Sequence, residues 1–393
     1  MSKLFIAASS LAAALAAAAP AYSQGTIKIG LIMSYSGQFA DPAAQMDNAV
    51  KLYVKQHGDT VAGKKLEFIR KDTGGIAPPL AKRLAQELVV RDKVDIIAGL
   101  VLTPNALAVG DVSAEAKKFT VIMNAATAII TTKSPYMART STTLPQLNET
   151  FGTWAAKKAG VKKVYTMVSD YGPGHDAEGA FQRGFKEAGG EIVGSVRMPV
   201  ANPDFSAFVQ RAKDINPEAI YVFIPGGTQP SALGRALAER GVDTAKTKIF
   251  GMGELTEDEA RKTMGDASLG IVTVYHYDHN HQSAMNREFV KAYNAEYNRN
   301  PNIYAVGGWD GMHLIYETLK KTKGNTDGDA LIAAAKGMKW ESPRGPISID
   351  PETRDIVQTV YIRRVEKVGG QLLNVEFDKV ENVKDPFKAR MKK

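Results

Sequence analysis

Short runs of β-branched and apolar residues alternate along the chain with segments whose apolar residues recur every three or four positions. The first kind of run is typical of a buried strand, and the second is typical of an amphipathic helix. From Thr26 to Tyr275 the two kinds follow one another in regular order. Because strand–helix alternation at this spacing builds parallel sheets covered by helices on both faces, the pattern predicts an α/β fold.

The alternation falls into two similar halves, each about 120 residues long, which suits one domain per half. The predicted strands are residues 27–33, 66–70, 94–98 and 119–123 in the first half, and 163–168, 192–198, 219–224, 248–250 and 271–275 in the second. The predicted helices are a segment through 49–54, then 79–91, 104–117, 144–159, 178–188, 205–213, 230–240, 283–297, 304–321 and 330–336. A β-like end over residues 347–377 completes the pattern.

The first residues differ from the rest in composition. A basic start at Lys3 precedes an apolar, alanine-rich run over residues 4–19, and small residues follow at 21–23. This arrangement predicts a signal peptide over residues 1–23, so that the exported chain begins near Gln24. No later stretch reaches the ~18 uninterrupted apolar residues that are typical of a membrane span.

The chain has no cysteine, and its net charge is +8. The absence of cysteine excludes disulfides, thiolate metal ligands, thiol catalysis and a lipid-modified cysteine. Acidic and basic residues are interleaved, whereas a protein that reads nucleic acid concentrates its positive charge on one face. We therefore expect no nucleic-acid partner, and we interpret the excess charge as an aid to solubility or to the attraction of an anion.

Small and hydroxyl-bearing residues follow three of the predicted strands of the first half. The loops are residues 34–39, 99–105 and 124–127, the last with the sequence Asn-Ala-Ala-Thr. Ligands of open parallel sheets gather outside the carboxyl ends of the strands, and free N–H groups at helix N-termini bind carboxylates. Thr103, followed by Pro104, suits a helix N-cap, and its hydroxyl then either only caps the helix or also meets a ligand. The three loops predict a site for a small carboxylate.

Several motifs occur together, in an order that is found in one known family. They are IGLIMSYSG over residues 29–37, Gly99-x-x-x-Thr103, the turn at 124–127, Asp170-Tyr171-Gly172-x-Gly174, and GPISID over residues 345–350. With these motifs the sequence resembles the leucine/isoleucine/valine-binding proteins of bacterial ABC transporters. The resemblance implies a two-lobed type I periplasmic binding fold, in which two Rossmann-like parallel-sheet domains are joined by a three-strand hinge and close on a ligand.

The resemblance also implies how the chain is divided and what it does. Lobe 1 would comprise residues 26–142 plus 278–344, and lobe 2 would comprise residues 143–277 plus 345–393. The protein would be a periplasmic, non-enzymatic monomer without a cofactor. It would deliver a small carboxylate to an inner-membrane ABC permease.

The implied ligand site lies between the two lobes. The residues that would hold the carboxylate are Ser36, Thr103, Ala125, Ala126 and Thr127, and those that would reach in from lobe 2 are Tyr171, Thr228 and Glu254. By residue type, an apolar or aromatic pocket could be lined by Tyr35, Phe39, Tyr171, Tyr304 and Trp309. The alternative for each of these aromatic residues is packing in the core or at an interface. Amino-acid binders of the family carry an aromatic residue after a pair of glycines, where this chain has Thr228, and the spacing around Glu254 departs from theirs as well. The ligand is therefore left open between a branched-chain amino acid and an aromatic acid.

Other functions compete with this interpretation. The segment 172–177 has the spacing G-x-G-x-x-A of a nicotinamide-binding turn, but Glu191, at the position of its acidic partner, begins a strand instead of ending one. Three histidines and an aspartate over residues 276–281 have the composition of a metal site, but they lie in a loop without a helical face to align them. No G-x-S-x-G motif of a hydrolase occurs. A sensor that presents the closed form to a receptor would use the same binding site.

Overall fold

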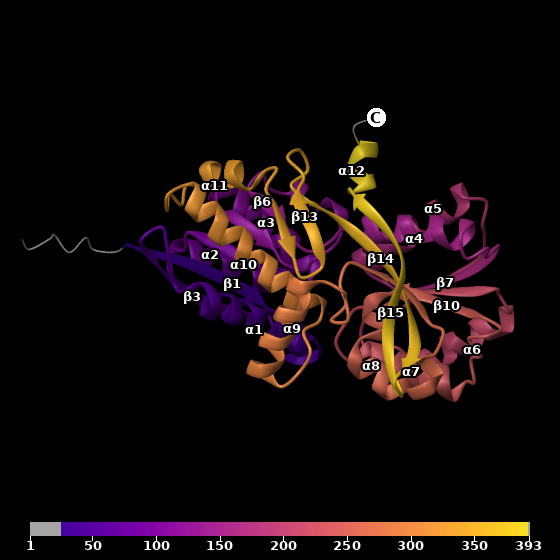
Figure 1. Ribbon diagram of the computed structural model, residues 1–393. Coiled ribbons are helices and arrows are strands. Elements are labelled where there is room, and N and C mark those ends of the chain that lie inside the picture. The colour runs from indigo at the N-terminus through magenta and orange to yellow at the C-terminus, as the bar shows by residue number, and fades with distance from the viewer. Residues whose placement is uncertain (1–24, 392–393) are drawn as a thin grey trace, which may run out of the picture.

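The computed structural model describes residues 25–391 of the chain (Figure 1). In this range the first sheet has six strands in the order β2-β3-β1-β4-β5-β6, and neighbours are parallel except for β2 and β3. The strands are β1 (Thr26–Met33), β2 (Thr60–Val61), β3 (Lys64–Asp72), β4 (Ile96–Gly99), β5 (Phe119–Ile122) and β6 (Met137–Arg139). Every residue of β4 and β5 is buried, as expected of central strands that are covered on both faces.

The second sheet has nine strands, of which β8-β7-β9-β10-β11 run parallel and the remainder antiparallel. Its parallel strands are β7 (Lys163–Ser169), β8 (Glu191–Met198), β9 (Ala219–Phe223), β10 (Lys248–Met252) and β11 (Val272–Tyr275). Its antiparallel strands are β12 (Lys339–Ser342), β13 (Gly345–Ile349), β14 (Ile356–Val368) and β15 (Gln371–Val383). In Figure 1 the long yellow strands β14 and β15 descend along the half of the molecule that holds β7 and β10.

Helices cover both sheets, and three late helices return to the first one (Figure 1). Those on the first sheet are α1 (Ala40–His57), α2 (Pro78–Val90), α3 (Thr103–Glu115), α9 (Ala284–Tyr297), α10 (Ile303–Lys321) and α11 (Gly328–Ala335). Those on the second sheet are α4 (Leu144–Lys157), α5 (Gly172–Glu187), α6 (Phe205–Ile215), α7 (Gln229–Glu239), α8 (Asp258–Met264) and α12 (Pro386–Met391). We call each sheet with its helices the first lobe and the second lobe.

Helix α10 lies close to the first sheet because it presents glycine to it. A Cβ on Gly307 would lie 2.2 Å from the carbonyl oxygen of Met123, so only glycine lets the two backbones meet. At the start of the helix, Asn302 Oδ1 accepts a hydrogen bond from the Tyr304 N–H at 3.0 Å and so caps the helix. The cap and the close approach together fix the position of Tyr304 at the edge of the first lobe.

The chain crosses between the lobes after β6, after β11 and again between α11 and β12. Buried arginines anchor these crossings. Arg344 Nη2 lies 2.8 Å from Asp310 Oδ2, and Arg363 Nη1 lies 2.9 Å from Asp278 Oδ2, with all four side chains buried. Because removing one partner of such a pair leaves a buried, uncompensated charge, each loss would destabilise the fold by about 3–5 kcal/mol.

The two parallel-dominated sheets confirm the predicted α/β fold, but some elements differ from the prediction. Helix α5 begins at Gly172 instead of residue 178, because its Gly-Pro-Gly first turn carries no apolar periodicity. The elements β2, β6, β12, α8 and α12 were not predicted. They are two to seven residues long, which is too short for a periodic signal.

Two predictions about the organisation of the chain are not tested by this architecture. The residue bounds of the two lobes, 26–142 plus 278–344 and 143–277 plus 345–393, stay a prediction. The predicted signal peptide, residues 1–23, lies outside the described residues. Between residues 25 and 391 the structure has no helix that is both long and apolar enough to cross a membrane.

Candidate functional site

A cavity lies between the lobes, where the carboxyl ends of strands from both sheets face each other. Its free volume is about 50 Å³. We call it the inner cavity. Its lining residues are Phe39, Pro42, Val101, Leu102, Thr103, Asn124, Ala126, Thr142, Leu144, Tyr171, Pro173, Phe223, Pro225, Gly226, Met252, Glu254, Tyr275 and Tyr304.

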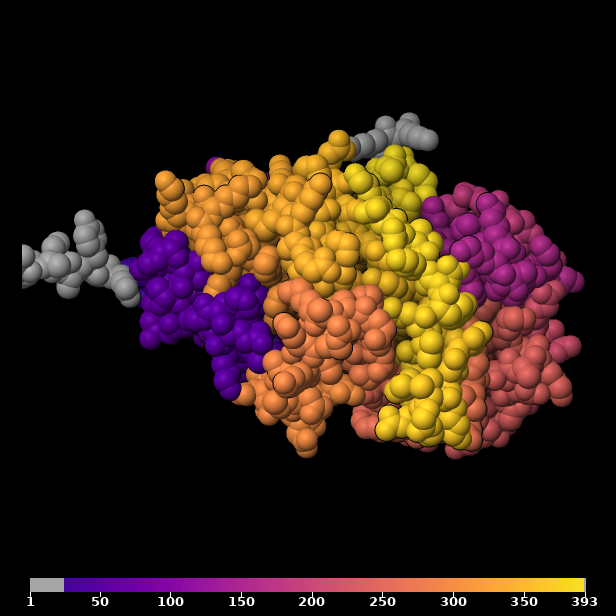
Figure 2. All heavy atoms as spheres, viewed as in Figure 1, coloured from indigo at the N-terminus to yellow at the C-terminus, as the bar shows by residue number. Residues whose placement is uncertain are grey.

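The two lobes touch each other beside the inner cavity. A Cβ on Gly227 of the second lobe would lie 2.3 Å from the carbonyl oxygen of Gln38 in the first. The Ala128 N–H donates a hydrogen bond to Asp176 Oδ2 at 2.9 Å across the same boundary. On the outer face in Figure 2, the orange segment near residue 280 adjoins the yellow C-terminal strands. The structure is therefore a closed form, in which a ligand would be enclosed between the lobes.

The first-lobe wall of the inner cavity is polar but uncharged. Thr103 Oγ1 and Thr127 Oγ1 lie 3.0 Å apart, and both side chains are buried. The Asn124 amide donates to the Val101 carbonyl oxygen at 2.8 Å and so ties the loop after β5 to the loop after β4. Among the described residues, no lysine or arginine lines the cavity. This wall therefore offers hydroxyl groups and the N–H groups at the start of α3 to an anion.

The prediction that Thr103 caps its helix is wrong. Helix α3 begins at Thr103 itself, and Leu102, whose side chain cannot cap, occupies the capping position. The Thr103 hydroxyl turns instead to Thr127, whose carbonyl oxygen accepts a hydrogen bond from Arg139 Nη2 at 2.8 Å. Arg139 is buried, and its Nε lies 3.2 Å from Asp355 Oδ1. The hydroxyl of Thr103 is thus held by the loop after β5 and not by its own helix.

Aromatic side chains form much of the remaining wall. Phe39 and Tyr304 come from the first lobe, and Tyr171 and Phe223 come from the second. The ring centroids of Tyr171 and Phe223 lie 6.3 Å apart. Burial raises the pKa of Tyr171 far above its usual range, so its phenol is neutral. Such walls suit a flat apolar ring, which aromatic side chains can contact by face or edge.

Glu254 is the acidic residue of the second-lobe wall. It lies in a 3-10 turn (Gly253–Thr256) that follows β10, and its Oε1 accepts a hydrogen bond from Tyr275 Oη at 2.9 Å. Its Oε2 is buried and has no partner among the described residues. Burial raises the pKa of Glu254 to about 7. The hydrogen bond from Tyr275 and the positive charge of Arg363 lower this pKa, but the effect of burial is larger. Since a buried carboxylate oxygen without a partner is costly, this atom is available to a ligand donor.

The structure brings part of the predicted site together. Phe39, Thr103, Ala126, Tyr171 and Glu254 all line the inner cavity. Thr127 lies one hydrogen bond behind this lining, and Ala125 is buried in a core cluster of the first lobe. The roles of these residues in ligand binding stay predictions.

Four other predicted site residues do not line the cavity. The Ser36 hydroxyl donates to Asp72 Oδ2 at 2.7 Å, and the Tyr35 N–H donates to Asp72 Oδ1 at 2.8 Å, at the end of β3. Thr228 is exposed just before α7. Trp309 is buried between α1 and α10, with its ring centroid 4.9 Å from that of an α1 tyrosine. Sequence patterns could not assign these side chains because they do not reveal which way a loop or helix residue points.

Some lining residues were not selected from the sequence. Phe223, Met252 and Tyr275 are the last residues of β9, β10 and β11. A bulky apolar residue in such a run has the pattern of a core residue, so these three residues do not stand out in the sequence. Their shared position at the carboxyl ends of adjacent parallel strands is the signal that could have found them.

The glycines of the segment 172–177 serve packing. A Cβ on Gly174 would lie 1.8 Å from the carbonyl oxygen of Ser169, so glycine lets α5 start directly against the end of β7. Pro173 lines the inner cavity. The spacing that resembled a nicotinamide-binding turn is therefore explained by the contact between strand and helix.

The histidine-rich segment has several separate contacts. His281 Nδ1 lies 2.9 Å from Glu376 Oε2, and His279 Nδ1 lies 3.7 Å from Asp258 Oδ1. His276 is buried, and burial lowers its pKa well below the usual value, so its ring is neutral. In the part of the chain that the structure describes, no three histidine or acidic side chains are grouped closely enough to hold a metal ion.

The chain matches known proteins over most of its length. A family model described as periplasmic binding protein matches residues 26–371. The Leu/Ile/Val-binding protein homolog 6 of Brucella abortus (strain 2308) is 40% identical over 385 residues, which are 97% of this chain and 98% of that protein.

Solved structures agree with this match. A solute-binding protein of an ABC transporter from Rhodopseudomonas palustris BisB5, in complex with 3,4-dihydroxy benzoic acid, is 55% identical, with a TM-score of 0.89 over 92% of this chain and 99% of its own. Another from Rhodopseudomonas palustris HaA2, in complex with p-hydroxybenzoic acid, is 41% identical, with a TM-score of 0.89 over 93% of this chain and 100% of its own. A leucine-binding protein from Thermotoga maritima MSB8, at 22% identity and a TM-score of 0.79, has the same fold.

These matches confirm the resemblance drawn from the motifs and the two-lobed type I fold that it implied. The relatives named here are binding proteins, and the nicotinamide-dependent alternative finds no support among them. The family match spans nearly all of the described chain, and the Brucella relative is similar from end to end. The chain therefore belongs to the periplasmic binding protein family, among the Leu/Ile/Val-binding type of solute-binding proteins.

Proposed function

We propose that this protein is the solute-binding component of an ABC importer and that it captures a hydroxylated benzoic acid in the inner cavity. The observation that carries the proposal is the lining of that cavity. Aromatic side chains surround it, and neutral hydroxyl groups stand on the first-lobe wall. On the second-lobe wall stands a buried carboxyl oxygen that has no partner within residues 25–391. The ABC-transporter relatives with bound dihydroxybenzoic and hydroxybenzoic acids support the same ligand class.

The ligand carboxylate would lie against the first-lobe wall. There it would accept hydrogen bonds from the Thr103 hydroxyl and from N–H groups near Ala126 and the start of α3. Thr127 would act behind them, because its hydroxyl orients that of Thr103. No arginine is required, since a helix N-terminus and hydroxyl groups can stabilise a carboxylate that is largely enclosed.

The ring and its hydroxyl would meet the second lobe. Tyr171 and Phe223 would pack on the ring, opposite Phe39 of the first lobe. A ring hydroxyl would donate to Glu254 Oε2, the oxygen that Tyr275 leaves free. A ligand held in this way contacts both lobes, so it binds the closed form better than the open form and shifts the population toward closure.

The location and the partner follow from the family. Periplasmic binding proteins of ABC importers work outside the inner membrane, and a signal peptide over residues 1–23 would export the chain to that compartment. The closed form with its ligand would dock on a membrane permease. In this role the protein would act as a monomeric carrier without a cofactor, as the family resemblance implies.

A ligand screen tests the proposal. The Tm of the purified protein is measured alone and with benzoate, para-hydroxybenzoate, 3,4-dihydroxybenzoate, leucine or valine. The Kd of each compound that raises the Tm is then measured on fresh protein by isothermal titration calorimetry. Binding to the folded state stabilises it by about 2.7 kcal/mol at a hundred times the Kd, so true ligands raise the Tm. We expect the two hydroxylated acids to bind most tightly. Tight binding of leucine or valine without binding of the benzoates would overturn the proposal.

A further inference from the structure

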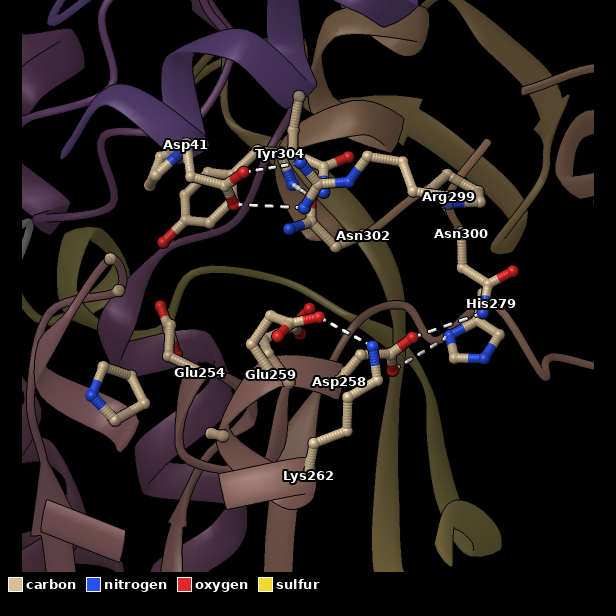
Figure 3. Close-up of a pocket in the computed structure, with 18 of the residues that line it drawn as sticks. Asp41, Glu254, Asp258, Glu259, Lys262, His279, Arg299, Asn300, Asn302 and Tyr304 are labelled. Atoms are coloured by element: carbon tan, nitrogen blue, oxygen red, sulfur yellow. Dashed lines mark hydrogen bonds and ion pairs between the residues drawn. The ribbon is translucent and has the colours of Figure 1, made fainter. Parts of the chain in front are cut away.

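A second cavity adjoins the inner cavity on the side of Glu254 (Figure 3). We call it the vestibule. Its free volume is about 400 Å³, and its lining is mostly polar and charged. Its charges are largely paired, as in the bond from Arg299 Nη1 to Asp41 Oδ1 at 2.6 Å. The residues that line both cavities, and so form the wall between them, are Pro42, Gly226, Glu254 and Tyr304.

Tyr304 and Gly226 meet in this wall from opposite lobes. Tyr304 lies at the start of α10 in the first lobe, and Gly226 follows β9 in the second. A Cβ on Gly226 would lie 2.0 Å from Tyr304 Oη, so the phenol rests directly on the glycine backbone. Because the contact joins the two lobes, it forms only when the cleft closes, and it separates the inner cavity from the vestibule at that moment.

The Tyr304 phenol has no bonding role elsewhere in the described chain. Its side chain is buried, but its hydroxyl has no hydrogen-bond partner among residues 25–391. In Figure 3 this hydroxyl lies at the same end of the vestibule as the carboxyl group of Glu254. The position of the ring therefore serves the wall itself, and the hydroxyl is free to meet a polar group of a ligand.

We propose that Tyr304, resting on Gly226, is a length gate that restricts the ligand to a ring bearing its carboxylate directly. The inference rests on the proposed function. An acid with two further carbons between ring and carboxylate would drive its ring into the Tyr304 phenol once its carboxylate reaches the first-lobe wall. The phenol would then be held off Gly226, and the lobes would not close fully. Since closure supplies the second-lobe contacts, such an acid binds weakly.

Removing the phenol would change this selection in a specific way. The inner cavity and the vestibule would become one continuous space, because Tyr304 contributes a full side chain to the wall while Gly226 contributes none. The longer acid could then extend past Glu254 with its ring hydroxyl among the polar groups of the vestibule. It would bind more tightly than before, while the shorter acid would lose contacts.

The experiment compares para-hydroxybenzoate with para-hydroxycinnamate by calorimetry on the full-length exported protein and its variants. We expect the unaltered protein to prefer the shorter acid by about 100-fold or more. Tyr304→Ala should reduce the preference to below about 10-fold, with an absolute gain for the longer acid. Tyr304→Phe keeps the ring and should keep the preference. Tyr304→Leu serves as a second truncation if the alanine variant does not fold.

The outcomes separate the gate from the proposed function. If the unaltered protein binds neither acid, the proposed function and the gate fail together. If it binds para-hydroxybenzoate but Tyr304→Ala or Tyr304→Leu weakens both acids equally, the gate is refuted and the proposed function stands. A matched variant, Gly226→Ala, places a methyl group against the phenol in the closed form. It should weaken both acids about equally, and a selective gain for the longer acid would contradict the wall described here.

Discussion

The two polar walls of the inner cavity differ in how far their hydrogen bonds are already satisfied. On the first-lobe wall, Thr103 bonds Thr127, and Asn124 bonds a neighbouring loop, so the groups are held in place before a ligand arrives. On the second-lobe wall, Glu254 has one oxygen bonded to Tyr275 and one that no group in the described part of the chain bonds. The groups of the first wall are thus oriented by bonds within their own lobe, whereas the second wall keeps an oxygen that a ligand donor would bond.

This difference indicates a division of labour. A fixed, neutral wall can hold the carboxylate that all candidate ligands share, and its neutrality keeps it indifferent to the rest of the molecule. A buried carboxyl group with a free oxygen strengthens the binding of a ligand that carries a donor. It weakens the binding of a ligand without one, because the oxygen then stays buried and unpaired. We therefore expect the first wall to set affinity for carboxylates in general and the second wall to set the choice among them.

The largest effect should come from the second wall. Glu254→Leu removes the acceptor for a ring hydroxyl, so binding of 3,4-dihydroxybenzoate should weaken by about 1.5–3 kcal/mol, the range for hydrogen bonds to charged groups. Benzoate has no ring hydroxyl, and its affinity should change by less than about 0.5 kcal/mol. Calorimetric titration of both ligands measures the difference.

A conservative variant makes this test sharper. Glu254→Gln keeps the shape of the side chain and an acceptor for Tyr275, and should weaken the hydroxylated ligand less than Glu254→Leu does. Equal losses for benzoate and 3,4-dihydroxybenzoate in the leucine variant would show that Glu254 supports the fold of the wall instead of choosing the ligand.

A smaller and uniform effect is expected at the first wall. Thr103→Val preserves the volume of the side chain but removes its hydroxyl, so every carboxylate ligand should lose about 1–1.5 kcal/mol of binding free energy. Titration of benzoate and para-hydroxybenzoate should give the same loss for both. Thr127→Val, which acts one bond further back, should cost less than Thr103→Val. A selective loss for the hydroxylated acid would reverse the roles given to the two walls.

The same contrast explains how much could be predicted from the sequence. The alternation of strand and helix predicted the two sheets, because the period of apolar residues changes between two and 3.6 wherever the element changes. The loop containing Asn124 and the threonine at 103 were identified because small and hydroxyl residues after buried strands are conspicuous in a sequence. The position of these loops was informative, but the direction of a single short side chain was not, because Thr103 lines the cavity whereas Ser36 bonds Asp72 instead.

The second wall was harder to predict for a physical reason. Tyr275 and Phe223 are large, and their direction depends on the strand register and on the approach of the other lobe, which no local pattern records. Tyr35 and Trp309 were selected by residue type, yet Trp309 packs inside the first lobe, and Tyr35 does not line the cavity. Glu254 was identified by family resemblance, but its free oxygen became evident only once its neighbours were in place.

The pH dependence of binding should be weaker still, and it belongs to the second wall. Burial raises the pKa of Glu254 from 4.5 to about 7. The protonated group therefore contributes to the stability of the folded, unliganded protein below pH 4.5, and this stability is lost as the pH rises to about 7. A ring hydroxyl donates best to the ionised form. Affinity for para-hydroxybenzoate should therefore rise severalfold from about pH 6 to about pH 8.

Two variants identify the titrating group. Glu254→Gln should abolish the rise in affinity. Glu257→Gln should leave it intact, because Glu257, whose pKa burial raises to about 8, lines only the vestibule. An affinity that falls over this range would mean that the protonated carboxyl group donates to the ligand, and the assignment of donor and acceptor would have to be exchanged.

The smallest effect on binding is expected at Trp309, which separates stability from recognition. Trp309 is buried between α1 and α10, and its Nε1 donates to Gln56 Oε1 at 3.4 Å. Trp309→Phe removes this donor and part of the buried ring, so the free energy of unfolding should fall by about 1–3 kcal/mol. Ligand affinity should change by less than about twofold, because the residue lines neither cavity. Thermal unfolding and titration of the same preparation measure both quantities. A change in the preference between benzoate and para-hydroxybenzoate would mean that the packing of α10 reaches the ligand through Tyr304. Selectivity would then depend on the first lobe as well, and the two walls could no longer be treated as independent.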